Sequence, residues 1–262
     1  MARFGREQAQ FELNLLRRLT FQLIGNPHAG ARLRLRSLRQ ALDFLQASYG
    51  LDLGAANVLD AGSGKGEYSF YLARRYPGVS VTGYELDGRK VERADRIARA
   101  LRTDHTRFLQ EDLLRLPRSE EFDLAICLDV LEHIEDDQAA IVALSGAMKP
   151  GGYLILHVPN LVRPHFHIEE EGHVRDGYDN EAMRLKLKQA GFEVLQIRNP
   201  IGLWGQWADD LCEVLSERPF LRGLGIPLYA GLVWLDQFGS QSRQFPEGAG
   251  LLAVARKPIV PR

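Results

Sequence analysis

Residues 58–66 read Val-Leu-Asp-Ala-Gly-Ser-Gly-Lys-Gly, an apolar run that ends in three glycines spaced by two. The apolar start predicts a buried strand, and the glycines predict a tight turn after it. Because glycine has no Cβ, such a turn can adopt positive φ and let a ligand lie against the main chain. The helix expected to begin near Tyr68 would point its free N–H groups at the same place. The stretch therefore predicts a strand, turn and helix that hold a nucleotide-like cofactor.

A carboxylate is expected at the tip of the neighbouring strand. Glu85 ends the segment 79–85 and lies 19 residues after Gly66. In nucleotide-binding folds, an acidic residue at about this separation accepts hydrogen bonds from the ribose hydroxyls. Two alternatives fit the turn less well, because dinucleotide dehydrogenases prefer Gly-x-Gly-x-x-Gly and a phosphate-binding loop needs Ser or Thr after Gly-Lys. We therefore interpret Lys65 as a solvent-facing turn residue.

Strands and helices alternate around this turn. The expected strands are 56–61, 79–85, 106–111, 122–128, 152–158, 192–198 and 250–257, with helices near 68–75, 88–101 and 136–148. Asp179 or Asn180 is expected to cap a further helix that ends at Gly191. This alternation predicts an α/β fold in which helices cover both faces of a parallel sheet.

Composition is typical of a globular protein. The chain has 262 residues, 45% of them hydrophobic, and a formal net charge of −1. No stretch approaches the roughly 20 apolar residues of a membrane span, and the N-terminus lacks the apolar core of a signal peptide. Cys127 and Cys212 provide neither a disulfide framework nor metal-ligand spacing. We therefore expect a cytoplasmic protein.

The first 50 residues are basic, with eight arginines against three acidic residues. They contain two helical patterns separated by Gly25-Asn26-Pro27, and the apolar positions are Phe11, Leu15, Leu16, Leu19, Leu23, Leu35, Leu38, Leu42 and Leu45. Basic amphipathic helices can contact an anionic membrane or phosphates. The interpretation that we prefer is a solvated face on helices that cover the domain or line the mouth of its cofactor site. Nucleic acid is not an expected partner, because the rest of the chain is acidic and no aromatic-basic interleaving occurs.

Further motifs follow the glycine turn in a fixed order. They are Asp60–Gly66 (Asp-x-Gly-x-Gly-x-Gly), Glu85, Asp112, Phe122–Ile134 (Phe-Asp-Leu-Ala-Ile-Cys-Leu-Asp-Val-Leu-Glu-His-Ile) and Lys149-Pro150-Gly151-Gly152. In this order they resemble the class I S-adenosylmethionine-dependent methyltransferases, over roughly residues 55–198 and 249–257. The resemblance implies a Rossmann-like, doubly wound sheet of seven strands, mostly parallel, with the last strand antiparallel. It also implies S-adenosyl-L-methionine as cofactor and methyl transfer as the activity.

The same resemblance implies which residues bind the cofactor. The methionine end is assigned to Asp60, Gly62, Ser63, Gly64 and Gly66. Glu85, with Leu86 beside it, is assigned to the ribose hydroxyls. Asp112 is assigned to the adenine amino group, and Leu113 to the adenine ring through a backbone N–H and an apolar surface. Asp129, at the end of the fourth strand, is expected to line the donor-acceptor junction.

Histidines are the candidate bases, because their unperturbed pKa of about 6.5 allows proton uptake at neutral pH. The candidates are His133, His157, His165, His167 and His173. The segment Gly172–Tyr178 resembles the His-x-Arg segment of quinone-biosynthesis O-methyltransferases, which implies His173 as base, Arg175 as a ligand of an acidic acceptor and Tyr178 as a further acceptor contact. The alternative for His173 is capping or bracing of the loop. His133 and Asp129 complete the catalytic candidates, although Leu-Glu-His-Ile is common across the family and favours a structural or cofactor-side role for His133.

His165 and His167 lie close to Glu169–Glu171. A metal site is one interpretation, but we prefer a polar active-site loop and predict no metal cofactor. The chain lacks an Asn/Asp-Pro-Pro-aromatic motif after the fourth strand, so we expect a small apolar or aromatic acceptor that is methylated at oxygen. Transfer to nitrogen or carbon, or a protein of this fold that binds cofactor or a partner without methyl transfer, are the alternatives.

The segment 199–248 separates the last two strands, which form a simple hairpin in the resembled family. It holds all three tryptophans, Trp204, Trp207 and Trp234. We predict two helices broken by Pro219, Gly223, Gly225 and Pro227, forming a lid in which Trp204 and Trp207 contact the substrate; a helical hairpin on the sheet edge or a homodimer contact are the alternatives. The predicted organisation is an N-terminal helical extension (1–50), a cofactor-binding core (51–198 and 249–258) and this insertion (199–248).

Overall fold

A single sheet runs through the computed structural model, which describes residues 4–11, 15–24, 26–161, 172–216, 219–240 and 248–259. Its seven strands lie in the order β3-β2-β1-β4-β5-β7-β6. They are β1 (Asn57–Ala61), β2 (Ser80–Glu85), β3 (Thr106–Gln110), β4 (Phe122–Leu128), β5 (Met148–Pro159), β6 (Glu193–Arg198) and β7 (Gly250–Arg256). The first five pair in parallel, and β7 lies antiparallel between β5 and β6. The Rossmann-like fold with an antiparallel last strand is confirmed.

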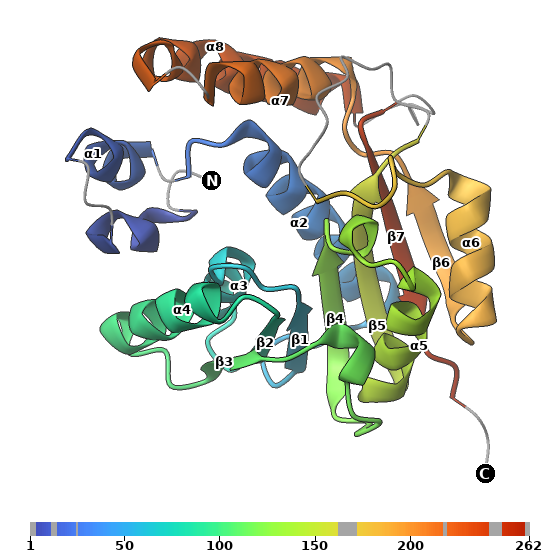
Figure 1. The fold of residues 1–262 in the computed structure, drawn as a ribbon. Coiled ribbons are helices and arrows are strands. Elements are labelled where there is room, and N and C mark those ends of the chain that lie inside the picture. The colour runs from blue at the N-terminus through green and yellow to red at the C-terminus, as the bar shows by residue number, and fades with distance from the viewer. Residues whose placement is uncertain are drawn as a thin grey trace.

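Helices cover both faces of this sheet (Figure 1). They include α2 (Ala29–Tyr49), α3 (Glu67–Arg75), α4 (Gly88–Leu101), α5 (Asp137–Ala147) and α6 (Asn180–Gln189). One apolar core joins Leu38 and Leu42 of α2 to the sheet, and a second joins Leu144 of α5 and Leu187 of α6 to the other face. Because both faces are covered, the central strands are almost continuously apolar, as parallel strands usually are.

The N-terminal helical patterns form η1 (Arg6–Phe11), α1 (Leu15–Ile24) and α2. Asn26, between α1 and α2, ties this region to the core: its N–H donates to the Phe4 carbonyl, and its side-chain Nδ2 donates to Glu67 Oε2 at 2.8 Å. The basic N-terminal region is thereby held over the start of α3, next to the glycine turn.

The segment between β6 and β7 forms two helices, α7 (Leu203–Ser216) and α8 (Pro219–Ser240), that pack on each other and on α2 (Figure 1). The break expected at Gly223, Gly225 and Pro227 is wrong, because α8 continues through all three positions. Tyr229 and Val233 are buried against α2 and α7. The stability that this burial contributes offsets the loss of the helical hydrogen bond that Pro227 cannot donate. No helix in the described part of the chain is long and apolar enough to cross a membrane.

Candidate active site

The glycine turn lies at the carboxyl ends of β1 and β2. Gly62 and Ser63 both donate their backbone N–H to the Tyr84 carbonyl, at 2.8 and 2.9 Å. Gly62 has a φ of 77°, and a Cβ there would lie 2.3 Å from a methyl group of Val130, so only glycine fits on both counts. Apart from its two chain neighbours, no described residue has an atom within 4 Å of the place a Cβ would take at Gly64, which leaves the main chain open to a ligand.

Glu85 is held beside this turn, as the sequence predicts. Its Oε2 accepts from Gly64 N and its Oε1 accepts from Asp87 N, both at 2.9 Å. Lys90 Nζ lies 3.7 Å from Oε1. The carboxylate is therefore fixed at the tip of β2 with its charge next to the open main chain, the arrangement that recognition of a ribose diol needs.

Asp60 is buried at the end of β1 and accepts a 2.6 Å hydrogen bond from Ser69 Oγ. Burial raises the pKa of Asp60 to about 6, against the opposing effect of the Ser69 hydrogen bonds. A cation beside this carboxyl group would favour its ionised form. Ser63 Oγ, also buried, has no hydrogen-bond partner within the described ranges. Both groups fit a ligand with an ammonium group and polar atoms, such as the methionine end of the implied cofactor.

The predicted adenine residues follow β3. Asp112 accepts from Leu114 N at 2.9 Å and begins the short helix η2 (Leu113–Arg115). Leu113 is buried, whereas Leu86, after β2, is largely exposed. Glu111 N donates to the Glu85 carbonyl, so the end of β3 is adjacent to the end of β2. Asp112 and Leu113 therefore follow the strand that pairs with β2, close to the end that carries Glu85.

A cavity of about 390 Å³ opens at this edge of the sheet. Its lining combines Gly62, Ser63 and Gly64 of the turn with Asp129, and with His133 and His173. A larger cavity of about 570 Å³ lies at the opposite edge, beside Asn57, Ser80 and His105, where the strands begin. Because ligands of open α/β sheets bind beyond the carboxyl ends of the strands, the smaller cavity is the candidate site.

Asp129, directly after β4, lies between two basic side chains. Its Oδ2 accepts from Arg34 Nη1 at 2.5 Å, and its Oδ1 lies 2.6 Å from His157 Nδ1. Burial raises the pKa of Asp129, but Arg34 and His157 together outweigh this effect and hold the pKa well below its usual range. Asp129 is therefore ionised at any working pH and is a weak proton acceptor. Sequence reasoning missed Arg34, which α2 brings into the cavity from 95 positions away.

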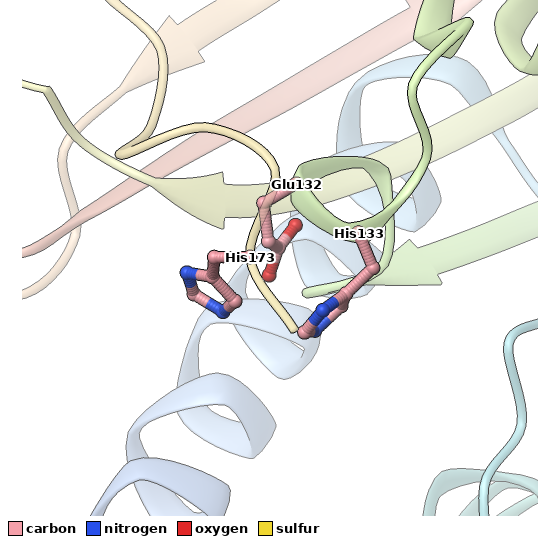
Figure 2. Close-up of side chains that lie close together, drawn as sticks. All are labelled: Glu132, His133 and His173. Carbon is pink, nitrogen blue, oxygen red and sulfur yellow. The ribbon is translucent and has the colours of Figure 1, made fainter. Parts of the chain in front are cut away.

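His133 and His173 lie together at the side of the cavity. Figure 2 shows the Glu132 carboxylate pointing between the two imidazole rings. The ring centroids are 4.6 Å apart, and His133 Nδ1 lies 2.9 Å from the Gly172 carbonyl oxygen. One oxygen of Glu132 and one nitrogen of each ring all lie within 4.8 Å of one another. Such a group can orient a base, and its donor atoms also suit a divalent metal. His165 and His167, with Glu169–Glu171, lie outside the described residues.

Arg175 and Tyr178 use their polar atoms to hold the chain around His173. Arg175 Nη1 donates to the carbonyls of Leu131 and Ile134, at 2.6 and 2.7 Å. The buried Tyr178 hydroxyl donates to Asp137 Oδ2 at 2.7 Å. Neither residue belongs to the lining of the 390 Å³ cavity. Their bonds fix the His173 segment against η3 (Leu131–His133) and α5, which is a positioning role; the expected contact with an acceptor stays a prediction.

Trp204 and Trp207 lie on α7, half exposed, with their rings edge to face at 5.3 Å. The structure does not bring either ring to the lining of the 390 Å³ cavity. Aromatic residues in a long insertion suggested a substrate contact. Their presence in the sequence does not tell whether they lie on the inner or the outer face of a helix.

The sequence of the chain is similar to those of known methyltransferases. A family model described as a methyltransferase domain matches residues 53–199. A ubiquinone biosynthesis O-methyltransferase of Xanthomonas oryzae pv. oryzae is 36% identical over 121 residues, covering 45% of this chain and 48% of that protein. The chain thus spans about half the length of the curated relatives that it matches.

Solved structures share the fold. Phosphoethanolamine N-methyltransferase 2 of Haemonchus contortus, in complex with S-adenosyl-L-methionine, is similar with a TM-score of 0.60 and 20% identity, over 84% of this chain and 52% of that one. The [4+2]-cyclase SpnF is similar with a TM-score of 0.59 and 22% identity, over 85% of this chain and 81% of that one. At these identities the likeness concerns the fold alone. The family match, however, covers more than half of the 262 residues, and the chain therefore belongs to the class I S-adenosylmethionine-dependent methyltransferases.

Proposed function

We propose that the protein transfers the methyl group of S-adenosyl-L-methionine to an oxygen atom of a small apolar or aromatic molecule. The main support for this proposal is the set of residues that line one cavity. The glycine turn lines the cavity together with Asp129, His133 and His173, so the turn that we assign to the cofactor and the candidate bases face the same cavity. Proximity of this kind is the main requirement for an in-line displacement.

The cofactor, when bound, supplies a methyl group on a sulfonium centre that an acceptor oxygen can displace. The protein's own residues would bind and orient the cofactor and the acceptor, and one of them would remove the acceptor's proton. Asp60 and Glu85 would hold the two ends of the ligand next to the open main chain at Gly64. Asp129 stays ionised and fixed between Arg34 and His157, so it would position groups at the junction and leave proton transfer to another residue.

His173 would take the proton of the acceptor hydroxyl on an imidazole nitrogen. The neighbouring Glu132 carboxylate lies close enough to orient the ring and to stabilise the imidazolium that forms. A base is needed only when the acceptor carries a proton that must leave, which favours a hydroxyl. The relatives named as ubiquinone biosynthesis O-methyltransferases also favour oxygen, whereas the N-methyltransferase of similar fold keeps nitrogen as the alternative.

The test is transfer of isotope-labelled methyl from S-adenosyl-L-methionine to a panel of apolar phenols and quinols, followed by mass spectrometry. We expect labelled product, and a turnover lowered about 10²- to 10⁴-fold in His173→Gln, the usual contribution of a positioned base. Affinity for S-adenosylhomocysteine should stay unchanged in this variant. His105→Gln, at the opposite edge of the sheet, is the matched control and should keep full turnover.

Equal turnover in His173→Gln and the control would remove His173 as the base. Cofactor binding without transfer to any acceptor would favour a protein of this fold with another activity, for which the similarity to a cyclase provides a precedent. Turnover should also survive a chelator. If a chelator abolished turnover and a divalent cation restored it, Glu132, His133 and His173 would be reassigned to metal binding.

A further inference from the structure

The α7–α8 hairpin exposes an unusual amount of apolar surface. Ten of the 18 large apolar side chains that are exposed in the described ranges lie on α1, α7 and α8. All three tryptophans of the chain are among them, with 44% of Trp204, 51% of Trp207 and 56% of Trp234 exposed. Monomeric soluble proteins rarely expose large contiguous apolar patches unless they bind something there.

The two faces of the hairpin are both apolar, but only one is covered. The inner face packs on Ala29 and Leu33 of α2 through Ala208, Cys212, Tyr229 and Val233. The outer face, defined by its exposed residues, consists of Leu203, Trp204, Trp207, Val214, Leu228, Trp234 and Leu235. In Figure 1 the hairpin is the outermost layer at its end of the molecule, with α2 beneath it.

Two acidic side chains of the hairpin lie beside α2. Asp236 of α8 is buried and pairs with Arg36 of α2. Asp209 of α7 lies beside α2, with its Oδ1 4.0 Å from His28 Nδ1. A helix that is apolar on nearly all sides belongs in a core or in contact with lipid. Since α8 is not apolar enough to span a bilayer, a contact with lipid would place it along the membrane surface.

A basic, leucine-bearing helix lies at the same end of the molecule (Figure 1). In α1, Leu15, Leu19 and Leu23 are exposed at a spacing of four, which puts them on one side of the helix. The helix contains Arg17 and Arg18 and no acidic residue. Leucines and tryptophans at the surface, next to arginines, are the features of segments that bind anionic lipid surfaces.

We propose that the outer face of the α7–α8 hairpin, together with α1, docks the protein on an anionic membrane surface. The helix α2, on which the hairpin packs, contributes Ala31 and Arg34 to the lining of the candidate cavity, so docking would keep the cavity close to the lipid. An apolar acceptor dissolved in the bilayer would then be within reach. Only this supply of acceptor rests on the proposed methyl transfer; the docking does not.

The tryptophans themselves report on this surface, because the chain has no others. We would mix the full chain with vesicles of phosphatidylglycerol or phosphatidylcholine and record tryptophan emission and co-sedimentation. With phosphatidylglycerol we expect a blue shift, quenching by brominated acyl chains and co-sedimentation; with phosphatidylcholine, much weaker effects. Neither measurement uses a methyl acceptor, so its failure is distinct from a failure of the proposed activity.

Variants locate the contact. Trp207→Ser combined with Leu235→Ser should weaken vesicle binding at least roughly tenfold, because two large apolar side chains lose their burial. Leu185→Ser, an exposed leucine of α6, is the matched control and should bind as the parent does. Arg18→Gln should weaken binding to the anionic vesicles about fivefold.

Three results would overturn the proposal. One is absence of co-sedimentation with both vesicles for a protein that binds S-adenosylhomocysteine. Another is equal loss of binding in Leu185→Ser. The third is blue-shifted emission without lipid together with a dimeric mass in analytical ultracentrifugation, which would show that a second copy covers the outer face.

Discussion

Arg34 and His157 change what Asp129 can do. Sequence motifs predicted the position of Asp129 at the end of β4, and the structure confirms it. They could not predict its two partners, because Arg34 is supplied by α2 and His157 by β5 through packing that no local pattern encodes. The same limit applies to Arg175 and Tyr178, whose bonds to Leu131 and Asp137 depend on how the chain returns to the sheet.

Glu85 gives the most direct test of cofactor recognition. Its replacement by alanine removes the acceptor of Gly64 N and, by the proposed assignment, of the ribose hydroxyls. We expect affinity for S-adenosylhomocysteine, measured by calorimetry, to fall by about 1.5–3 kcal/mol, the range for hydrogen bonds to a charged group. Glu121→Ala, exposed at the opposite edge of the sheet, should bind as the parent does. Unchanged affinity in Glu85→Ala would refute the ribose assignment.

The raised pKa of Asp60 predicts how cofactor affinity depends on pH. Because its folded pKa of about 6 lies above the ordinary value of 3.8, the carboxyl group takes up a proton as the pH falls through 6. The same raised pKa means that its contribution to stability is present below pH 4 and is lost as the pH rises through 6. An ammonium group prefers the ionised form, so affinity for S-adenosylhomocysteine should rise up to about tenfold per pH unit below 6 and level off above 7.

Titrations between pH 5 and 8 would check this dependence. Asp60→Asn cannot ionise, and the slope near pH 6 should vanish in this variant while weaker binding persists. A slope of the same size in Asp60→Asn would assign the titration to another group.

Among the secondary-structure elements, periodicity predicted most bounds. The central strands are buried on both faces and flanked by capped helices, so β2, β4 and α4 begin and end within a residue of the expected positions. β5 begins at Met148, four residues early, because Met148 pairs with Phe122 and the Lys149–Gly152 segment, where glycine and proline suggested a turn, forms an irregularity within the strand. In α8, burial of one helix face outweighed the helix-breaking effect of glycine and proline.

The link between α2 and α8 is an ion pair that sequence could not reveal. Arg36 and Asp236 are both buried, and Asp236 also accepts from Gly205 N at 3.0 Å. Asp236→Ala would leave the Arg36 charge buried without its partner. We expect a loss of about 3–5 kcal/mol in the free energy of unfolding, measured with urea.

The double variant Arg36→Met, Asp236→Leu tests the cause of that loss. It removes both charges and keeps similar volume, so most of the stability should return. A double variant as unstable as Asp236→Ala would show that the backbone hydrogen bonds to Asp236, and not the unpaired arginine, hold α8 in place.

At the scale of the molecule, the cavity is built from distant parts of the chain. The glycine turn follows β1, Asp129 follows β4, His173 precedes α6, and Arg34 comes from α2. A ligand that contacts all of them should stabilise the whole fold. S-adenosylhomocysteine at 100 times its Kd should add about 2.7 kcal/mol and raise the thermal midpoint by about 5–10 °C. The Glu85→Ala variant should show a smaller shift at the same concentration; an unshifted parent would contradict cofactor binding.

The position of β7 also determines how the protein can be made. β7 follows every other strand in the chain, yet it pairs with both β5 and β6. During synthesis, β5 and β6 therefore wait with unpaired edges until residues 250–256 leave the ribosome. Open strand edges are sites of aggregation. The nascent chain should therefore depend on chaperones until β7 emerges and pairs with both edges.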